Sequence, residues 1–134
     1  MATAVKHVYQ EGVGRRKEAV ARVRILEAAK SAFSVNEKSL ENYFSTNSQR
    51  ETAMLPLVEL GSKKVGVTAH VRGGGLASQA EAVSLGLARA IEIMDATLRA
   101  PLKKKGLLSR NARIKERRKF GLKKARKSPQ WSKR

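Results

Sequence analysis

Residues 65–94 read VGVTAHVRGGGLASQAEAVSLGLARAIEIM, which combines two hydrophobic periods on either side of a glycine triplet. Before the triplet, apolar residues alternate with polar or small ones at Val65, Val67, Ala69 and Val71. That period of two predicts a β-strand with one buried face. After the triplet, apolar residues recur every three or four positions from Ala80 to Leu98. This spacing predicts a long helix with one stripe against a core.

Two Ser-x-x-Glu patterns predict where helices begin. Ser78 and Glu81 have the spacing of a capping box, in which each side chain bonds a free backbone amide of the other. They are expected to open the long helix, and Pro101 to close it. Ser48 and Glu51 have the same spacing and predict a short helix that ends before Pro56.

Three further strands are expected upstream of the short helix, over residues 7–13, 19–25 and 32–35. The first two are close enough to form a hairpin around residues 12–14 (Gly-Val-Gly) and the basic triplet at residues 15–17. Arg22 and Arg24 fall on the strand face opposite the apolar residues, so one face of the sheet is expected to be apolar and the other basic. The order β-β-β-α-β-α predicts an α+β fold, a two-layer α/β sandwich.

The charge of the chain is concentrated at its C-terminal end. Residues 103–134 contain fifteen Lys or Arg residues and a single acid, Glu116, so they carry about +14 of the formal +18. We therefore expect a globular domain over residues 1–102 and an extended basic tail over residues 103–134. Such a charge density predicts a tail that is disordered when free and ordered by its partner, although residues 106–108 (Gly-Leu-Leu) could dock back on the domain.

The partner of such a tail is expected to be a polyanion, with nucleic acid favoured over an anionic membrane because the tail has no segregated apolar face. A localisation signal or a solubilising charge run is the plainer alternative. Trp131, the only tryptophan, lies in a segment with no core to bury it, and stacking on a base would use it well.

Catalytic and metal chemistry have little support. The chain has no Cys, and its two histidines and one aspartate (His7, His70 and Asp95) form no recognisable catalytic or metal-binding pattern. We expect no enzyme activity, no cofactor and no metal. No stretch resembles a signal peptide or a membrane span, so a soluble, intracellular protein is expected.

Two motifs allow more than one reading. Gly73–Gly75 lack the spacing of nucleotide-binding loops, so a tight turn with positive φ is favoured over contact with an RNA phosphate. The basic triplet at residues 15–17 could simply be solvated. Because it shares the molecule with Arg22, Arg24 and the tail, contact with phosphate is the favoured reading.

Four segments together resemble a known family. They are GVGRRK at residues 12–17, NEKSLENYF at residues 36–44, VRGGG at residues 71–75 running into Gln79-Ala80, and GLKKARKSPQWSKR at residues 121–134. From Tyr9 onward the chain is similar to the family of the ninth protein of the small ribosomal subunit, bacterial or organellar type. Two residues depart from the family pattern: Glu11 stands where an aromatic is usual, and Trp131 replaces Phe or Tyr.

The resemblance implies a left-handed crossover in the sandwich and a place in the head of the small subunit, bound to ribosomal RNA and beside neighbouring head proteins. It also implies that the tail reaches the peptidyl site and contacts the anticodon stem-loop of transfer RNA. The ribosome would be cytoplasmic, or in the stroma or matrix if the chain is organelle-encoded. The alternatives are a DNA-compacting protein of the nucleoid type and an RNA-modifying enzyme that uses His70 or Asp95.

The expected site residues form two sets. The residues expected to bind ribosomal RNA are Arg15, Arg16, Lys17, Arg22, Arg24, Arg72, Arg110, Arg113, Arg117, Arg118, Lys119, Lys123, Lys124, Arg126 and Lys127. The residues expected to contact transfer RNA are Trp131, Ser132, Lys133 and Arg134.

Overall fold

A five-stranded sheet organises the chain, which a computed structural model describes over residues 9–134. The strands are β1 (Gln10–Arg16), β2 (Ala19–Glu27), β3 (Ala32–Val35), β4 (Lys38–Ser39) and β5 (Val65–Arg72). Their order across the sheet is β1-β2-β5-β3-β4. The β1–β2 hairpin is antiparallel, β5 runs antiparallel to β2, and β3 runs parallel to β5. Part of the first expected strand, residues 7 and 8, lies outside the described residues.

Helices fill the connections. Between β4 and β5 lie α1 (Leu40–Tyr43), α2 (Asn47–Met54) and α3 (Leu57–Leu60). After β5 come α4 (Leu76–Met94), the 3-10 turn η1 (Ala96–Leu98) and α5 (Arg99–Lys104). The predicted order and the α+β sandwich class are confirmed. The extra elements β4, α1, α3, η1 and α5 are two to six residues long, too short for a hydrophobic period to reveal them.

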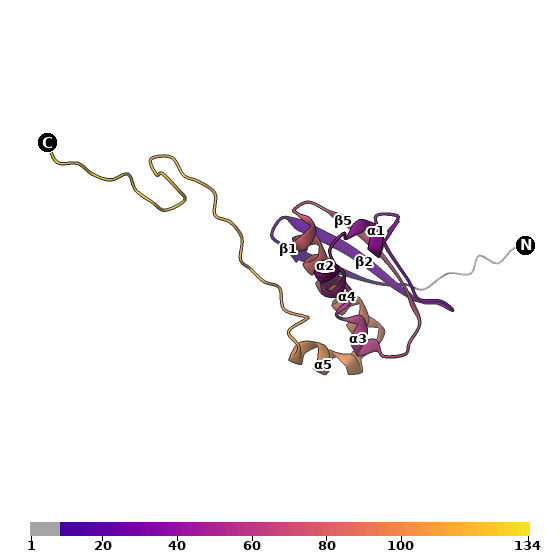
Figure 1. The fold of residues 1–134 in the computed structure, drawn as a ribbon. Helices are drawn as coiled ribbons and strands as arrows, with labels where there is room; N and C mark the ends of the chain where they lie inside the picture. The colour runs from indigo at the N-terminus through magenta and orange to yellow at the C-terminus, as the bar shows by residue number, and fades with distance from the viewer. Residues whose placement is uncertain (1–8) are drawn as a thin grey trace, which may run out of the picture.

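The long helix α4 forms the centre of the molecule. It packs on β1 and β2 with one side and against α2 with another, as Figure 1 shows. Burial on both sides explains its many small residues, among them Ala82 and Gly86, which let the sheet approach closely. Phe44, Ile25 and Leu87 are the largest side chains buried in the resulting core.

The predicted helix boundaries need correction. Helix α4 begins at Leu76 with Gly75 as its N-cap, so Ser78 lies inside the first turn instead of capping it. Helix α2 likewise begins at Asn47, with Thr46 as an N-cap whose side chain makes no capping bond. Both predicted capping boxes were therefore wrong, because Ser-x-x-Glu fits the interior of a helix equally well when the preceding turn already sets its start.

The end of the long helix also differs from the prediction. Helix α4 ends at Met94, where Asp95 leaves helical geometry with φ −143° and accepts a hydrogen bond from the Thr97 amide. Pro101 lies within α5, near its start, where its missing N–H is tolerated. The chain thus turns six residues before the proline that was expected to stop it.

The glycine triplet makes the tight turn that its sequence predicts. Gly73 and Gly74 have φ of +76° and +63°, and a β-carbon on Gly73 would stand 2.4 Å from the Glu18 carbonyl oxygen. Gly75 has ordinary extended backbone. The side chain of Gln79 donates to the Gly73 carbonyl oxygen at 3.0 Å and accepts from the Tyr43 hydroxyl at 2.8 Å. Contact of this turn with RNA stays a prediction.

The NEKSLENYF segment (residues 36–44) has a structural role at the same turn. Asn36 donates to the Val71 carbonyl oxygen at 2.8 Å and accepts from the Val71 amide at 2.9 Å. These two bonds continue the pairing of the sheet beyond the end of β3, and they fix the last residues of β5 in front of the glycine turn.

Beyond α5, the chain remains attached to the domain for a few residues and then leaves it. Leu107 and Leu108 pack against the core, as expected for residues 106–108. Residues 109–134 contain no helix or strand, and beyond a hydrogen bond of Arg113 to the hairpin they run away from the domain (Figure 1). The division at residue 102, the disorder of the free tail and the handedness of the crossover stay predictions. No helix in the described part of the chain is long and apolar enough to cross a membrane.

Candidate nucleic-acid interface

One face of the sheet is basic. Gly12 and Gly14 of β1 lie against α4, so the alternate residues of this strand point to the opposite side. Strand register then places residues of β2 and β5 beside them in rows. We call this the open face, and it consists of Glu11, Val13, Arg15, Val20, Arg22, Arg24, Thr68, His70 and Arg72. Arg22, Arg24 and His70 therefore lie where the alternation predicts.

Glu11 organises two of the open-face arginines. Its carboxylate lies 2.9 Å from Nε of Arg24 and 2.9 Å from Nε of Arg22. The hydrogen bond from Arg24 and the charge of Arg22 lower the pKa of Glu11 below its ordinary value despite some opposing desolvation. The Tyr9 ring also stacks under the Arg24 guanidinium, 4.6 Å from its centroid. Both pairs use Nε, and a guanidinium has further N–H donors that can bind phosphate.

The basic triplet at the hairpin tip divides between two surfaces. Arg15 is exposed on the open face, and Lys17 is exposed in the turn with φ of +51°. The Arg16 side chain points to α4 and is only 13% exposed, with its Nε 2.6 Å from the Glu81 carboxylate. Its Nη1 also donates to the Arg113 carbonyl oxygen at 3.0 Å. Arg16 thus links the hairpin, α4 and the tail, and its contact with RNA stays a prediction.

The tail presents basic and aromatic side chains to the outside. Its single acid, Glu116, pairs with Lys119 and with Arg126 at 2.7 Å, so the chain curls between them. Phe120 and Trp131 are 101% and 80% exposed. The other expected tail ligands are exposed as well: Arg110, Arg113, Arg117, Arg118, Lys123, Lys124, Lys127, Ser132, Lys133 and Arg134. The structure does not bring the tail end near the open face (Figure 1).

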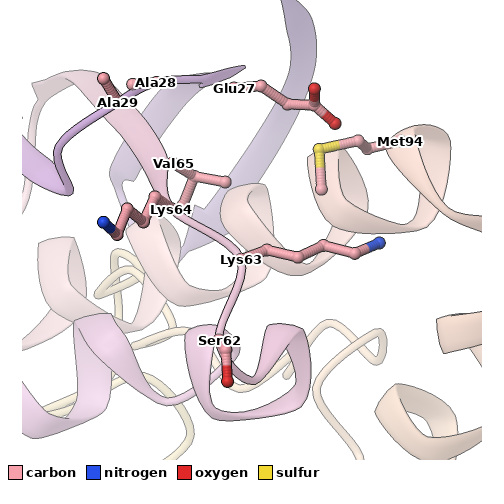
Figure 2. A pocket seen from close by; sticks show the side chains of 8 residues that line it. All are labelled: Glu27, Ala28, Ala29, Ser62, Lys63, Lys64, Val65 and Met94. Atoms are coloured by element: carbon pink, nitrogen blue, oxygen red, sulfur yellow. The ribbon is translucent and has the colours of Figure 1, made fainter.

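A hollow lies at the end of β2 and β5 that is remote from the hairpin tip. It has a volume of about 590 Å³ and is open to solvent, and Figure 2 shows that Lys63 and Lys64 of its lining extend in different directions. Lys63 is already paired with Asp95 at 2.9 Å. Hydrogen bonds from the Thr97 hydroxyl and from Lys63 lower the pKa of Asp95 to about 2. The hollow therefore lacks the convergent polar groups of a ligand site.

Sequence reasoning missed three residues of this interface. Glu11 was noted only as a departure from a family pattern, although the strand period places it on the same face as Arg22 and Arg24. Glu81 was assigned to a capping box, whereas it binds Arg16 across 65 residues of sequence. Tyr9 offered no pattern at all, because its ring is placed by contact with Arg24.

Two comparisons of the sequence with known proteins identify its family. The family described as ribosomal protein S9/S16 matches residues 14–134. A relative from Saccharopolyspora erythraea, the small ribosomal subunit protein uS9, is 49% identical over 123 residues, which are 91% of this chain and 80% of the relative. These matches confirm the resemblance that the four motifs indicated. The chain belongs to the ribosomal protein S9/S16 family, and it is a structural ribosomal protein and not an enzyme.

Proposed function

We propose that this protein is a constituent of the head of the small ribosomal subunit and that it binds ribosomal RNA through the open face, the hairpin tip and the tail. Its last four residues contact the anticodon stem-loop of transfer RNA in the peptidyl site. The ribosome is cytoplasmic, or in the stroma or matrix if the chain is organelle-encoded. The observation that supports this proposal most strongly is that basic residues occur both on one face of the folded sheet and in a tail that contains fifteen of them.

The open face suits folded RNA because its arginines are held in rows by the strands. Arg15 and Arg72 flank Val20 on adjacent strands, and Arg22 and Arg24 follow two residues apart. Arginine binds phosphate through paired N–H donors, and such contacts fix the position of a protein without reading sequence. Glu11 removes part of the charge while it orients two of the guanidinium groups.

The tail suits crowded RNA because a single extended chain can pass between packed RNA helices where a folded domain would not fit. Each basic residue that neutralises a phosphate releases counterions, which favours binding at low salt. Exposed Phe120 and Trp131 can each stack on a base, worth about 1–3 kcal/mol per base.

The chain terminus is the part that supports a contact with transfer RNA. Ser132, Lys133 and Arg134 are exposed at the end of a segment that runs away from the domain. Contacts from Lys133 and Arg134 to the phosphate backbone are independent of nucleotide sequence, which suits a site used by every elongator and initiator transfer RNA.

Sedimentation at high salt tests this proposal. The tagged chain should remain with small subunits on a gradient at about 0.5 M salt, because the domain and the tail are locked in folded RNA. A loose polycation dissociates under these conditions. A chain that floats free at high salt, or that travels with chromosomal DNA at low salt, would contradict the ribosomal RNA contacts and favour the DNA-compacting alternative.

A further inference from the structure

The surface of α2 and α3 differs in charge from the rest of the molecule. Residues 39–62 contain three acids, Glu41, Glu51 and Glu59, and a single base, Arg50. This segment has a formal charge of −2, so the remaining residues carry +20. A phosphate backbone would be attracted less to this region than to the basic surfaces of the molecule.

The single base of this region, Arg50, forms hydrogen bonds within the domain. The Arg50 guanidinium donates to the carbonyl oxygens of Phe44 at 2.6 Å, Glu41 at 3.0 Å and Ser45 at 3.2 Å. It also donates to the Asn47 side chain at 3.2 Å. These bonds tie the end of α1 to α2 and occupy most of the Arg50 N–H donors, so few of them are left to bind a phosphate or a carboxylate.

The same region exposes a cluster of apolar side chains. Met54, Leu55 and Val58 are 43%, 46% and 67% exposed, and they line one groove of about 440 Å³. We call it the α2–α3 groove, and its lining is Asn47, Arg50, Glu51, Met54, Leu55 and Val58. Figure 1 shows α2 and α3 beside α4. Isolated exposed apolar residues are ordinary, whereas these three share one groove, which makes the groove the candidate surface for a partner.

We propose that the α2–α3 groove binds a cationic segment of another protein of the small subunit, with an aliphatic or aromatic anchor residue seated among Met54, Leu55 and Val58. Charge complementarity selects this occupant. Glu51 lines the groove and Glu41 is exposed in α1, and neither takes part in the ion pairs of the described residues. Acid at the rim and apolar area at the centre match a basic segment with a hydrophobic anchor.

This inference rests on the proposed place of the chain in the small subunit, where RNA occupies the basic surfaces. The groove lies in the part of the domain that attracts RNA least, so it is left for protein. Glu59, the third acid, is already paired with Lys105 and lies 12% exposed, so the acid that the groove itself offers to a partner is Glu51.

Photo-crosslinking within assembled small subunits tests the proposal. A benzophenone amino acid replaces Val58 in one chain and His70 of the open face in a second chain. Position 58 should crosslink to a peptide of another ribosomal protein that is rich in Lys or Arg around an apolar residue. Position 70 should crosslink to ribosomal RNA, which reports on the proposed function separately.

Each other outcome at position 58 overturns the docking proposal. The groove has a different occupant if position 58 crosslinks to RNA, to the tail of the same chain, to a second copy or to an acidic protein. If position 58 forms no crosslink, the groove is exposed to solvent and binds no partner. If position 58 reaches a basic protein while position 70 misses RNA, the docking proposal stands and the open-face assignment fails. Chains absent from small subunits would overturn both.

A charge reversal supplies the second measurement. Glu51→Lys should lower the crosslink yield from position 58 about two- to fivefold, as expected for one rim ion pair. Glu27→Lys makes the same change on an exposed residue of β2 and should leave the yield unaltered. Equal yields from the two variants would contradict a cationic partner.

Discussion

Gly14 of β1 lies so close to Ala82 of α4 that a β-carbon on Gly14 would stand 1.8 Å from the Ala82 carbonyl oxygen. Gly12 makes the same close approach one turn further along α4, where a β-carbon on Gly12 would stand 2.2 Å from the Gly86 carbonyl oxygen. Backbone therefore meets backbone along this contact. It brings the hairpin close enough to α4 for Arg16 to reach Glu81.

Replacing Gly14 with alanine should destabilise the fold by about 3 kcal/mol or more, because the helix would have to move away from the hairpin. The free energy of unfolding, measured with urea, checks this expectation. Gly75→Ala is the matched control, since its β-carbon would meet nothing within 4 Å and its φ is −107°, and it should cost about 1 kcal/mol or less, as expected for a weaker N-cap of α4. Equal costs for the two variants would contradict the close packing of Gly14 on α4.

Arg16 and Glu81 should be energetically coupled across the hairpin and α4. A double-mutant cycle with Arg16→Ala and Glu81→Ala should give a coupling of about 0.5–1 kcal/mol, because the pair lies at a partly exposed surface. About 1 M salt should reduce that coupling. The same Arg16→Ala variant should speed exchange of the Arg113 amide, because Arg113 loses its anchor to the hairpin and the bond from its amide to the Asn111 side chain then opens more often. A coupling near zero together with unchanged exchange would contradict the link between tip and tail.

Removing the acid of the open face should strengthen RNA binding. Glu11→Gln deletes the carboxylate that pairs with Arg22 and Arg24, so affinity for a ribosomal RNA fragment should rise on the order of threefold at low salt. Glu41→Gln in α1 makes the same change of charge away from the open face. If both variants bind RNA equally tightly, the open face is not the RNA-binding surface of the domain.

Asp95 should make stability depend on pH in acid. Its pKa is lowered from an ordinary 3.8 to about 2, first by the Thr97 hydroxyl and then by Lys63. Its contribution to stability is therefore complete above about pH 4 and is lost as the pH falls toward 2. Asp95→Asn should flatten the fall in unfolding free energy over that window. Thr97→Val should raise the pKa of Asp95 toward 3.8, as measured by NMR, and an unmoved pKa would show that the Thr97 hydroxyl does not cause the shift.

Much of the fold follows from patterns that repeat along the chain. Period two in residues 65–71 and 19–25 and period three to four after residue 80 act over many residues, so each predicts its element. Register then follows from alternation, which is why Arg22, Arg24 and His70 lie on the expected face. The glycine turn was also predictable, since a positive φ at Gly73 is a local property of the backbone.

What could not be predicted depends on contacts between distant segments. The start of α4 is set by the turn at Gly73 and Gly74, so the Ser78–Glu81 pattern predicted the wrong N-cap for this helix. Glu81 binds Arg16 only because the glycines of β1 admit the helix, and a single sequence does not show that approach. The groove on α2 and α3 is equally hidden, because Met54 and Leu55 look like core residues until the fold leaves them outside.

The most direct test of the proposed function is a deletion of Lys133 and Arg134. Small subunits assembled with the shortened chain should form in normal yield, because the domain and the remaining tail still hold ribosomal RNA. Their affinity for transfer RNA in the peptidyl site, measured by filter binding, should fall several-fold, whichever transfer RNA is used. Unchanged affinity in fully assembled subunits, or a failure of assembly itself, would contradict the division of labour between domain and tail.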